Sequence, residues 1–130
     1  EGAEAAEGAE GAGGAEGDGR LVADASEALA ILRGCSAVVA LHPDQAAEPA
    51  VRLALALRRP FAVVPCCVYA AEFPRRRLPS SGAPVRTYED LLDYLQGLSP
   101  HIRREELDFE GKKTVLFMTP SDVAAADQKK

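Results

Sequence analysis

The sequence predicts an α/β fold, with parallel strands joined by crossover helices and then a C-terminal antiparallel hairpin. Two apolar runs, at residues 36–41 and 61–64, have the Val-rich composition of parallel strands. The amphipathic segment between them has the length of a crossover helix. Near the C-terminus, residues 103–109 and 114–118 are separated by a turn so short that the two strands must be antiparallel.

The first nineteen residues differ in composition from the rest of the chain. They comprise six acidic residues, seven Gly and six Ala, which cannot bury enough apolar surface to offset the entropy of ordering. We expect a disordered acidic tail over residues 1–19, an α/β domain over residues 20–120 and a flexible tail over residues 121–130. The net charge of −5 belongs to the first tail, because fourteen acids and fifteen bases remain elsewhere.

Cysteine usage and hydropathy bear on the compartment. Three cysteines, two of them adjacent, form no disulfide framework, which is typical of a reducing, cytoplasmic environment. No apolar run has the length of a membrane span, and no signal peptide is visible. We therefore expect no membrane partner, and nothing in the sequence indicates DNA binding. The sequence begins at Glu1 rather than Met, which suggests a piece of a longer protein.

The first two helices have recognisable starts. Asp24, with Glu27 three residues later, forms the pattern of a capping box, and Gly34 is suited to close that helix in the left-handed conformation. The strand at 36–41 follows, and its continuous apolar composition predicts burial on both faces. The crossover helix is expected to begin near Ala47 or Glu48, because proline at position 49 is tolerated only in a first turn.

The segment after the second strand is irregular before a third helix begins. Residues 73–84 are rich in Pro, Gly, Ser and Arg and predict an exposed loop. Thr87 then caps a helix, with Asp90 at the matching position of a capping box. Apolar residues recur at helical spacing on one face of this helix: Tyr88, Leu91, Leu92, Leu95 and Leu98.

Ligands of open α/β sheets bind at the carboxyl edge of the parallel strands. Six residues follow the two predicted parallel strands at this edge: His42, Pro43 and Asp44 after the first, and Pro65, Cys66 and Cys67 after the second. His42 is the candidate catalytic residue, because imidazole titrates near neutral pH and can orient a substrate or carry a proton. The alternative is a turn residue whose ring satisfies a nearby carbonyl. Asp44 is a candidate catalytic acid or, alternatively, a helix N-cap.

The adjacent cysteines favour a packing role over chemistry. Neighbouring side chains on a strand point to opposite faces, and adjacent cysteines rarely close on one ion, so we expect no metal site. A nucleophilic thiol needs a lowered pKa and a base, and the sequence shows neither. We expect Cys66 and Cys67, with Pro43 and Pro65, to line a substrate pocket.

Arg75, Arg76 and Arg77 form the strongest cluster of positive charge. They could hold the phosphates of an RNA or nucleotide substrate. Because no aromatic residues are interleaved with them, a solvated loop is the preferred interpretation.

Two residue runs, one after each strand of the parallel pair, resemble class I, Rossmann-like S-adenosylmethionine-dependent methyltransferases of the Leu-His…Pro-Cys-Cys type: Leu41-His42-Pro43-Asp44 and Val64-Pro65-Cys66-Cys67. The similarity covers about residues 20–118 and continues through three further runs: Phe73-Pro74, Pro84-Val85-Arg86-Thr87-Tyr88 and Phe109-Glu110-Gly111-Lys112. The resemblance implies the C-terminal half of that fold: a partial methyltransferase sheet with S-adenosylmethionine as cofactor and RNA or a small molecule as substrate.

The sequence departs from that family in the part that binds the cofactor. The family's Gly-rich loop and the acid that ends its second strand are both missing, and the glycines of the tail follow no apolar strand. Only Asp24 lies where the family's third strand offers a side chain to the adenine, and the alternative role of Asp24 is a helix cap. The cofactor is therefore expected only if a longer protein supplies the loop, and the chain alone is expected to be inactive.

Three hypotheses of different classes follow. The first is the C-terminal portion of a methyltransferase. The second is a degenerate methyltransferase-like module that binds a partner without chemistry, and the third is a plain α/β interaction domain. A Gly-rich loop encoded upstream of Glu1 would favour the first.

Overall fold

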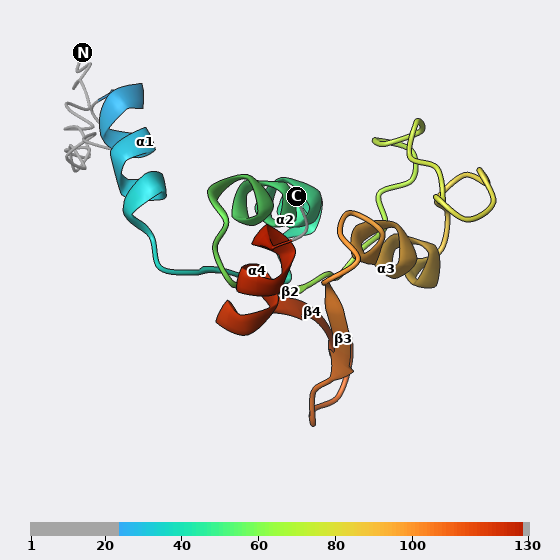
Figure 1. Cartoon of the computed structure of the whole chain (residues 1–130). Coiled ribbons are helices and arrows are strands. Elements are labelled where there is room, and N and C mark those ends of the chain that lie inside the picture. Colours follow the sequence, from blue (N-terminus) through green and yellow to red (C-terminus); the bar gives the residue numbers. More distant parts are fainter. Residues whose placement is uncertain (1–23, 129–130) are drawn as a thin grey trace, which may run out of the picture.

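The computed structural model describes residues 24–128 and shows an α/β arrangement around one open, mixed, four-stranded sheet (Figure 1). The strands lie in the order β1-β2-β4-β3 and have these bounds: β1, Val38–Leu41; β2, Phe61–Val64; β3, Arg103–Glu106; β4, Thr114–Met118. The expected disordered tail at residues 1–19 lies outside the described residues. No helix within residues 24–128 is long and apolar enough to cross a membrane.

The pairing of the strands agrees with the sequence at both predicted pairs. β1 and β2 are parallel and in register from Val38 with Phe61 to Leu41 with Val64. β3 and β4 are antiparallel. The strand β4 also pairs antiparallel with β2, so the second strand of the hairpin lies inside the sheet and β3 forms its far edge.

Two helices cover one face of the sheet and form the core with it. α2 (Ala47–Leu57) begins where Pro49 requires, and α3 (Tyr88–Gln96) begins with the predicted capping box of Thr87 and Asp90. Buried apolar side chains of both helices meet the core face of the strands, and the largest fully enclosed ones include Val51, Val63, Leu91, Leu92, Leu95 and Leu116.

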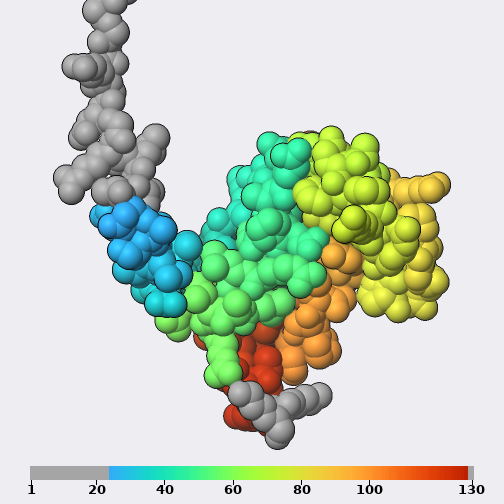
Figure 2. Space-filling model, turned by 90° about the horizontal axis from the view of Figure 1, so that it is seen from above, coloured from blue at the N-terminus to red at the C-terminus, as the bar shows by residue number. Residues whose placement is uncertain are grey.

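The first helix stands apart from this core. α1 (Ala25–Gly34) begins at the predicted cap, yet none of its residues is buried. Figures 1 and 2 show it at the margin of the folded body, beyond the amino end of β1. The expectation for Gly34 is wrong, because Gly34 is the last helical residue and does not adopt a positive φ.

Strand β1 is exposed on one face, contrary to the expectation of burial on both. Val38 and Ala40 pack against the core, whereas Val39 is 77% exposed and Leu41 is 65% exposed. Successive side chains of a strand point to opposite faces. Among the described residues, no helix covers the outer face of β1, and this explains the difference.

The C-terminal part differs from the sequence expectation in two places. Residues 121–127, which belong to the expected C-terminal tail of residues 121–130, are helical as part of α4 (Pro120–Asp127), which begins with a capping box of Thr119 and Asp122. Its Val123 and Ala126 pack against the core. β3 ends at Glu106, three residues earlier than expected, because the chain then enters a turn that includes Gly111 at φ 98°.

Candidate functional site

The residues that follow β1 and β2 lie side by side at the carboxyl edge of the sheet. The amide of His42 donates to the carbonyl of Val64 at 2.9 Å, which extends the parallel pairing one step beyond the strands. The segments His42-Pro43-Asp44 and Pro65-Cys66-Cys67 therefore face each other, as the sequence predicts. His42 and Cys67 are exposed, whereas Cys66 is half-buried.

The ring of His42 contacts the turn between β3 and β4. Its Nε2 lies 3.1 Å from the carbonyl oxygen of Lys112, 70 residues later in the chain. A carbonyl only accepts, so Nε2 is the donor in this contact. This contact is what a structural role predicts.

Asp44 contacts Cys66 instead of capping α2. The thiol Sγ of Cys66 donates to Asp44 Oδ1 at 3.3 Å. A short 3₁₀ segment (Asp44–Ala46) separates Asp44 from α2, whose N-cap is Ala46 without a side-chain hydrogen bond, so the N-cap interpretation of Asp44 is wrong. Burial, together with the hydrogen bond to Asp44, raises the pKa of the Cys66 thiol. A thiol held protonated suits packing rather than nucleophilic attack.

Two tyrosines that the sequence did not mark as functional join this edge. Tyr88 donates its hydroxyl to the carbonyl of Pro65 at 2.8 Å, and Lys112 Nζ lies 4.1 Å from the centroid of its ring. Burial raises the pKa of Tyr88. Burial and the neighbouring Asp44 raise the pKa of Tyr69. The helical spacing assigned Tyr88 to an apolar face, and no pattern marks Tyr69.

The backbone of the carboxyl edge is strained at three residues. His42, Asp44 and Tyr69 have φ angles of 48°, 51° and 49°, in the left-handed region that residues with a Cβ avoid. Such outliers persist where surrounding contacts hold them, and they cluster at ligand sites and active sites. Three of the four non-glycine residues with positive φ among the described residues thus lie at this edge, and the fourth, Arg58, is the C-cap of α2.

Asp24 does not lie with the other candidate residues. Its Oδ1 accepts from the Ser26 hydroxyl at 2.6 Å and from the Glu27 amide at 2.8 Å, and these bonds lower its pKa. This is the helix-cap role, at the end of α1 farther from the sheet (Figure 1). The structure brings Asp24 to neither His42 nor Cys66.

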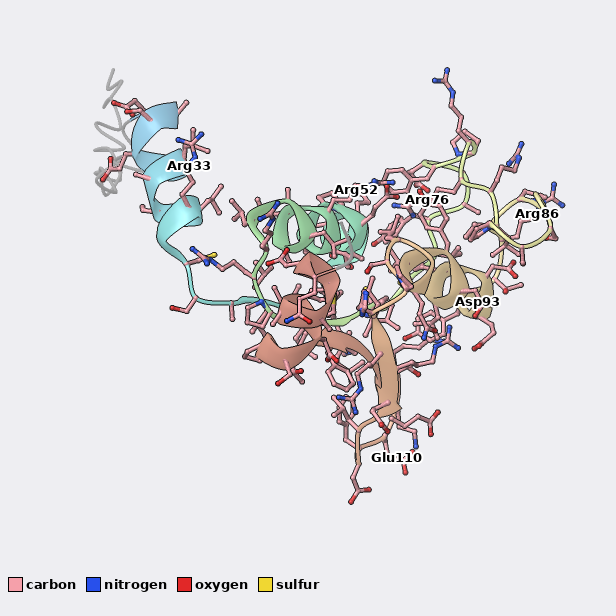
Figure 3. All side chains as sticks on the ribbon, viewed as in Figure 1. Arg33, Arg52, Arg76, Arg86, Asp93 and Glu110 are labelled. Carbon is pink, nitrogen blue, oxygen red and sulfur yellow. The ribbon has the colours of Figure 1, made fainter. Side chains whose placement is uncertain are left out.

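A second feature is a groove of about 670 Å³ between α2, α3 and the loop after β2. It is lined by Glu48, Pro49, Arg52, Glu72, Phe73, Pro74, Arg75, Arg76 and Tyr94. Figure 3 shows Arg52 on α2 and Arg76 on the loop on the same upper side of the molecule. The sequence analysis did not identify this groove, because its walls come from separate parts of the chain.

Glu48 and Arg76 form the polar centre of the groove. The Arg76 side chain is only 8% exposed, and its Nε lies 2.8 Å from Glu48 Oε1. Its guanidinium carbon lies 3.8 Å from the ring centroid of Phe73. The other carboxylate oxygen of Glu48, Oε2, accepts from Arg52 Nε at 2.8 Å and from the Tyr94 hydroxyl at 3.3 Å. The expectation of a solvated loop therefore fails for Arg76.

The charge state of Glu48 follows from these contacts. Burial acts to raise the pKa of its carboxyl, but the hydrogen bond from Arg52, the charge and hydrogen bond of Arg76, and the Tyr94 hydroxyl outweigh it. The net effect holds the pKa of Glu48 below its ordinary value. Glu48 is thus an anion whose two oxygens are both engaged.

Among the described residues, no three His, Cys, Asp or Glu side chains are grouped to hold a metal ion. Comparison of the chain with family models, with curated proteins and with solved structures finds no match. A functional assignment therefore depends on the carboxyl edge and the groove.

Proposed function

We propose that this chain is the C-terminal half of an S-adenosylmethionine-dependent methyltransferase. The order strand, helix, strand, helix and antiparallel hairpin is the order that the family resemblance implies. The motif residues His42, Asp44 and Cys66 lie at the carboxyl edge, where α/β sheets bind ligands; there Cys66 contacts Asp44, and His42 contacts the Lys112 carbonyl. In this proposal His42 exchanges a proton with the substrate through Nδ1, and Asp44 holds the wall of the site through Cys66.

The observation that carries this proposal is the outer edge of β1, with which no strand among residues 24–128 pairs. The amides of Val38 and His42 donate to carbonyls on the side of β2. Amides alternate in direction along a strand, so those of Val39 and Leu41 point away from the sheet. Their side chains are also exposed and apolar. A further parallel strand with a covering helix would satisfy both the hydrogen bonds and the apolar face.

The opposite edge of the sheet offers a contrast. β3 reads Arg103-Arg104-Glu105-Glu106, and charged residues of this kind protect an edge strand from pairing with another chain. β1 reads Val38-Val39-Ala40-Leu41 and carries no such protection. The two edges therefore support a sheet that ends at β3 and continues beyond β1.

The described residues of this chain, 24–128, do not form a cradle for S-adenosylmethionine. The Gly-rich loop is missing from the sequence, and Asp24, the one expected adenine contact, caps a helix away from the carboxyl edge. Binding must also offset the loss of motional freedom of the cofactor. We therefore assign the cofactor site to the completed protein, with RNA or a small molecule as methyl acceptor.

A non-catalytic interaction module is the second candidate. The exposed edge of β1 favours it, because an added strand from a partner would satisfy the same amides. The internal contacts of His42 and Cys66 are also consistent with structural roles. The two candidates differ in whether the completed protein transfers methyl groups.

Isothermal titration and methyl transfer separate these candidates. S-adenosylmethionine should not bind residues 1–130 with a low-micromolar Kd, whereas the full-length product of the gene should bind it and methylate total cellular RNA or a small substrate. There, His42→Ala should lower kcat about a hundredfold, as loss of an acid–base group does, with little change in Tm. Cys67→Ala should leave both kcat and Tm nearly unchanged, because Cys67 is exposed. Low-micromolar binding by residues 1–130, or no transfer by the full-length protein, would contradict the proposal.

A further inference from the structure

The surface around the groove carries an excess of outward-facing positive charge. Arg52 is 57% exposed, and Arg75 and Arg86 are exposed residues of the loop that follows β2. Figure 3 shows Arg52, Arg76 and Arg86 along one side of the molecule, from α2 across the loop. Within residues 24–128, no carboxylate lies within ion-pair distance of the guanidinium of Arg75 or Arg86. Asp90 Oδ2 accepts from the backbone amide of Arg86 at 3.0 Å.

The two carboxylates of the groove compensate only part of this charge, because three arginines line it. Glu48 has both oxygens engaged by Arg52, Arg76 and Tyr94. Glu72 is the other acid of the lining, against three arginines. An anionic occupant therefore fits the groove better than a cationic one, because the guanidinium groups of Arg52 and Arg75 face solvent at its rim.

The remaining walls of the groove are aromatic and apolar. Phe73, Tyr94, Pro49 and Pro74 contribute them, and Arg76 already stacks on the ring of Phe73 at 3.8 Å from its centroid. Arginine and aromatic faces beside exposed positive charge are the features by which proteins hold unpaired bases and their phosphates. A groove of about 670 Å³ has the size of a small-ligand site, so it can take a single base that is not stacked in a duplex.

We propose that this groove binds a single strand of nucleic acid. Its phosphates lie on Arg52, Arg75 and Arg86, and one base packs between Phe73 and the proline walls. The Glu48–Arg76 pair holds Phe73 in place and is not itself a ligand group. This binding does not require methyl transfer or the completion of the sheet, because every residue involved belongs to the described part of this chain.

The test uses residues 1–130 and a fluorescein-labelled twelve-nucleotide oligouridylate, followed by fluorescence anisotropy at several salt concentrations. Three phosphate contacts predict a slope of about −2 for log K against log salt, since each contact on a single strand contributes about −0.7. Arg75→Ala should weaken binding about threefold to tenfold and make the slope less steep by about 0.7. Phe73→Leu should weaken binding without changing the slope.

Arg33→Ala provides the matched control, because Arg33 is an exposed arginine on α1, away from the groove (Figure 3). It should bind the oligonucleotide as the unaltered chain does. Circular dichroism and Tm check that each variant is folded. The proposal is overturned if nothing binds, if Arg33→Ala weakens binding as much as Arg75→Ala, or if a duplex or a polyglutamate peptide competes as well as the unlabelled single strand. Loss of the proposed methyl transfer would leave these results unchanged.

Discussion

His42, Asp44 and Tyr69 adopt left-handed backbone conformations at the carboxyl edge. Each such conformation costs about 1–2 kcal/mol for a residue with a Cβ. Contacts of these side chains offset the cost: His42 Nε2 with Lys112 and Asp44 Oδ1 with Cys66. These contacts hold the backbone of the carboxyl edge in its left-handed conformation.

The ion pair between Glu48 and Arg76 is the polar contact of the groove most shielded from water. Glu48→Gln should lower the free energy of unfolding by about 2 kcal/mol. Breaking a fully buried pair costs about 3–5 kcal/mol, and Glu48 keeps part of its exposure. Arg52→Gln, which removes an exposed partner of the same carboxylate, should cost under about 0.5 kcal/mol. Urea denaturation measures the free energy of unfolding of both variants. Equal losses of stability in Glu48→Gln and Arg52→Gln would contradict the assignment of the Glu48–Arg76 pair as the shielded contact.

The same carboxylate gives the stability a dependence on pH. The folded state lowers the pKa of Glu48. Its contribution is therefore fully present above the unfolded pKa, about 4.3, and is lost as the pH falls through the folded value. Glu48→Gln should accordingly have a shallower loss of stability between about pH 5 and pH 3. If the free energy of unfolding falls equally with pH in the unaltered chain and in Glu48→Gln, Glu48 does not contribute to the pH dependence of stability.

Local residue roles could be predicted from the sequence, and distant partners could not. The caps at Asp24 and Thr87 depend on neighbours three residues away, so the sequence displays them. The pair Glu48–Arg76 joins residues 28 positions apart, and Arg76 lies in a loop without periodicity. The partner of His42 is a backbone carbonyl, a group that every residue carries.

At the scale of elements, β1 shows how an apolar pattern and its exposure can disagree. The sequence of β1 has the composition of a strand covered on both faces, and the structure covers only one. The proposed continuation of the sheet beyond β1 would cover the second face. The helix α4 was not predicted from the sequence. Its start signal, Thr119, Pro120 and Asp122, is nevertheless recognisable.

Substitutions on the two faces of β1 test this interpretation. Val39→Lys should change the free energy of unfolding of residues 1–130 by under about 0.5 kcal/mol, because the side chain is 77% exposed. Ala40→Lys should cost about 3 kcal/mol, because it forces a charge toward the core. In the full-length protein, Val39→Lys should instead be strongly destabilising. Chemical denaturation of these three variants and of the two unaltered proteins measures the changes. An Ala40→Lys variant as stable as unaltered residues 1–130 would show that the two faces of β1 are assigned wrongly.

At the scale of the whole molecule, the sequence predicted an α/β class, a parallel pair and an antiparallel pair. It did not predict that β4 lies between β2 and β3. That placement pairs Phe61 with Met118, residues far apart in the chain, and no local pattern encodes such a register. The groove arises in the same way, from α2, α3 and a loop that meet only in the folded chain.

Hydrogen exchange at the outward amides of Val39 and Leu41 tests most directly whether the sheet continues beyond β1. We expect both amides to exchange at nearly unprotected rates in residues 1–130, while the amide of His42, bonded to Val64, is protected. In the full-length product of the gene, the amides of Val39 and Leu41 should slow by about a thousandfold, as expected for strand amides inside a sheet. Fast exchange at both positions in the full-length protein, or protection already present in residues 1–130, would contradict the account.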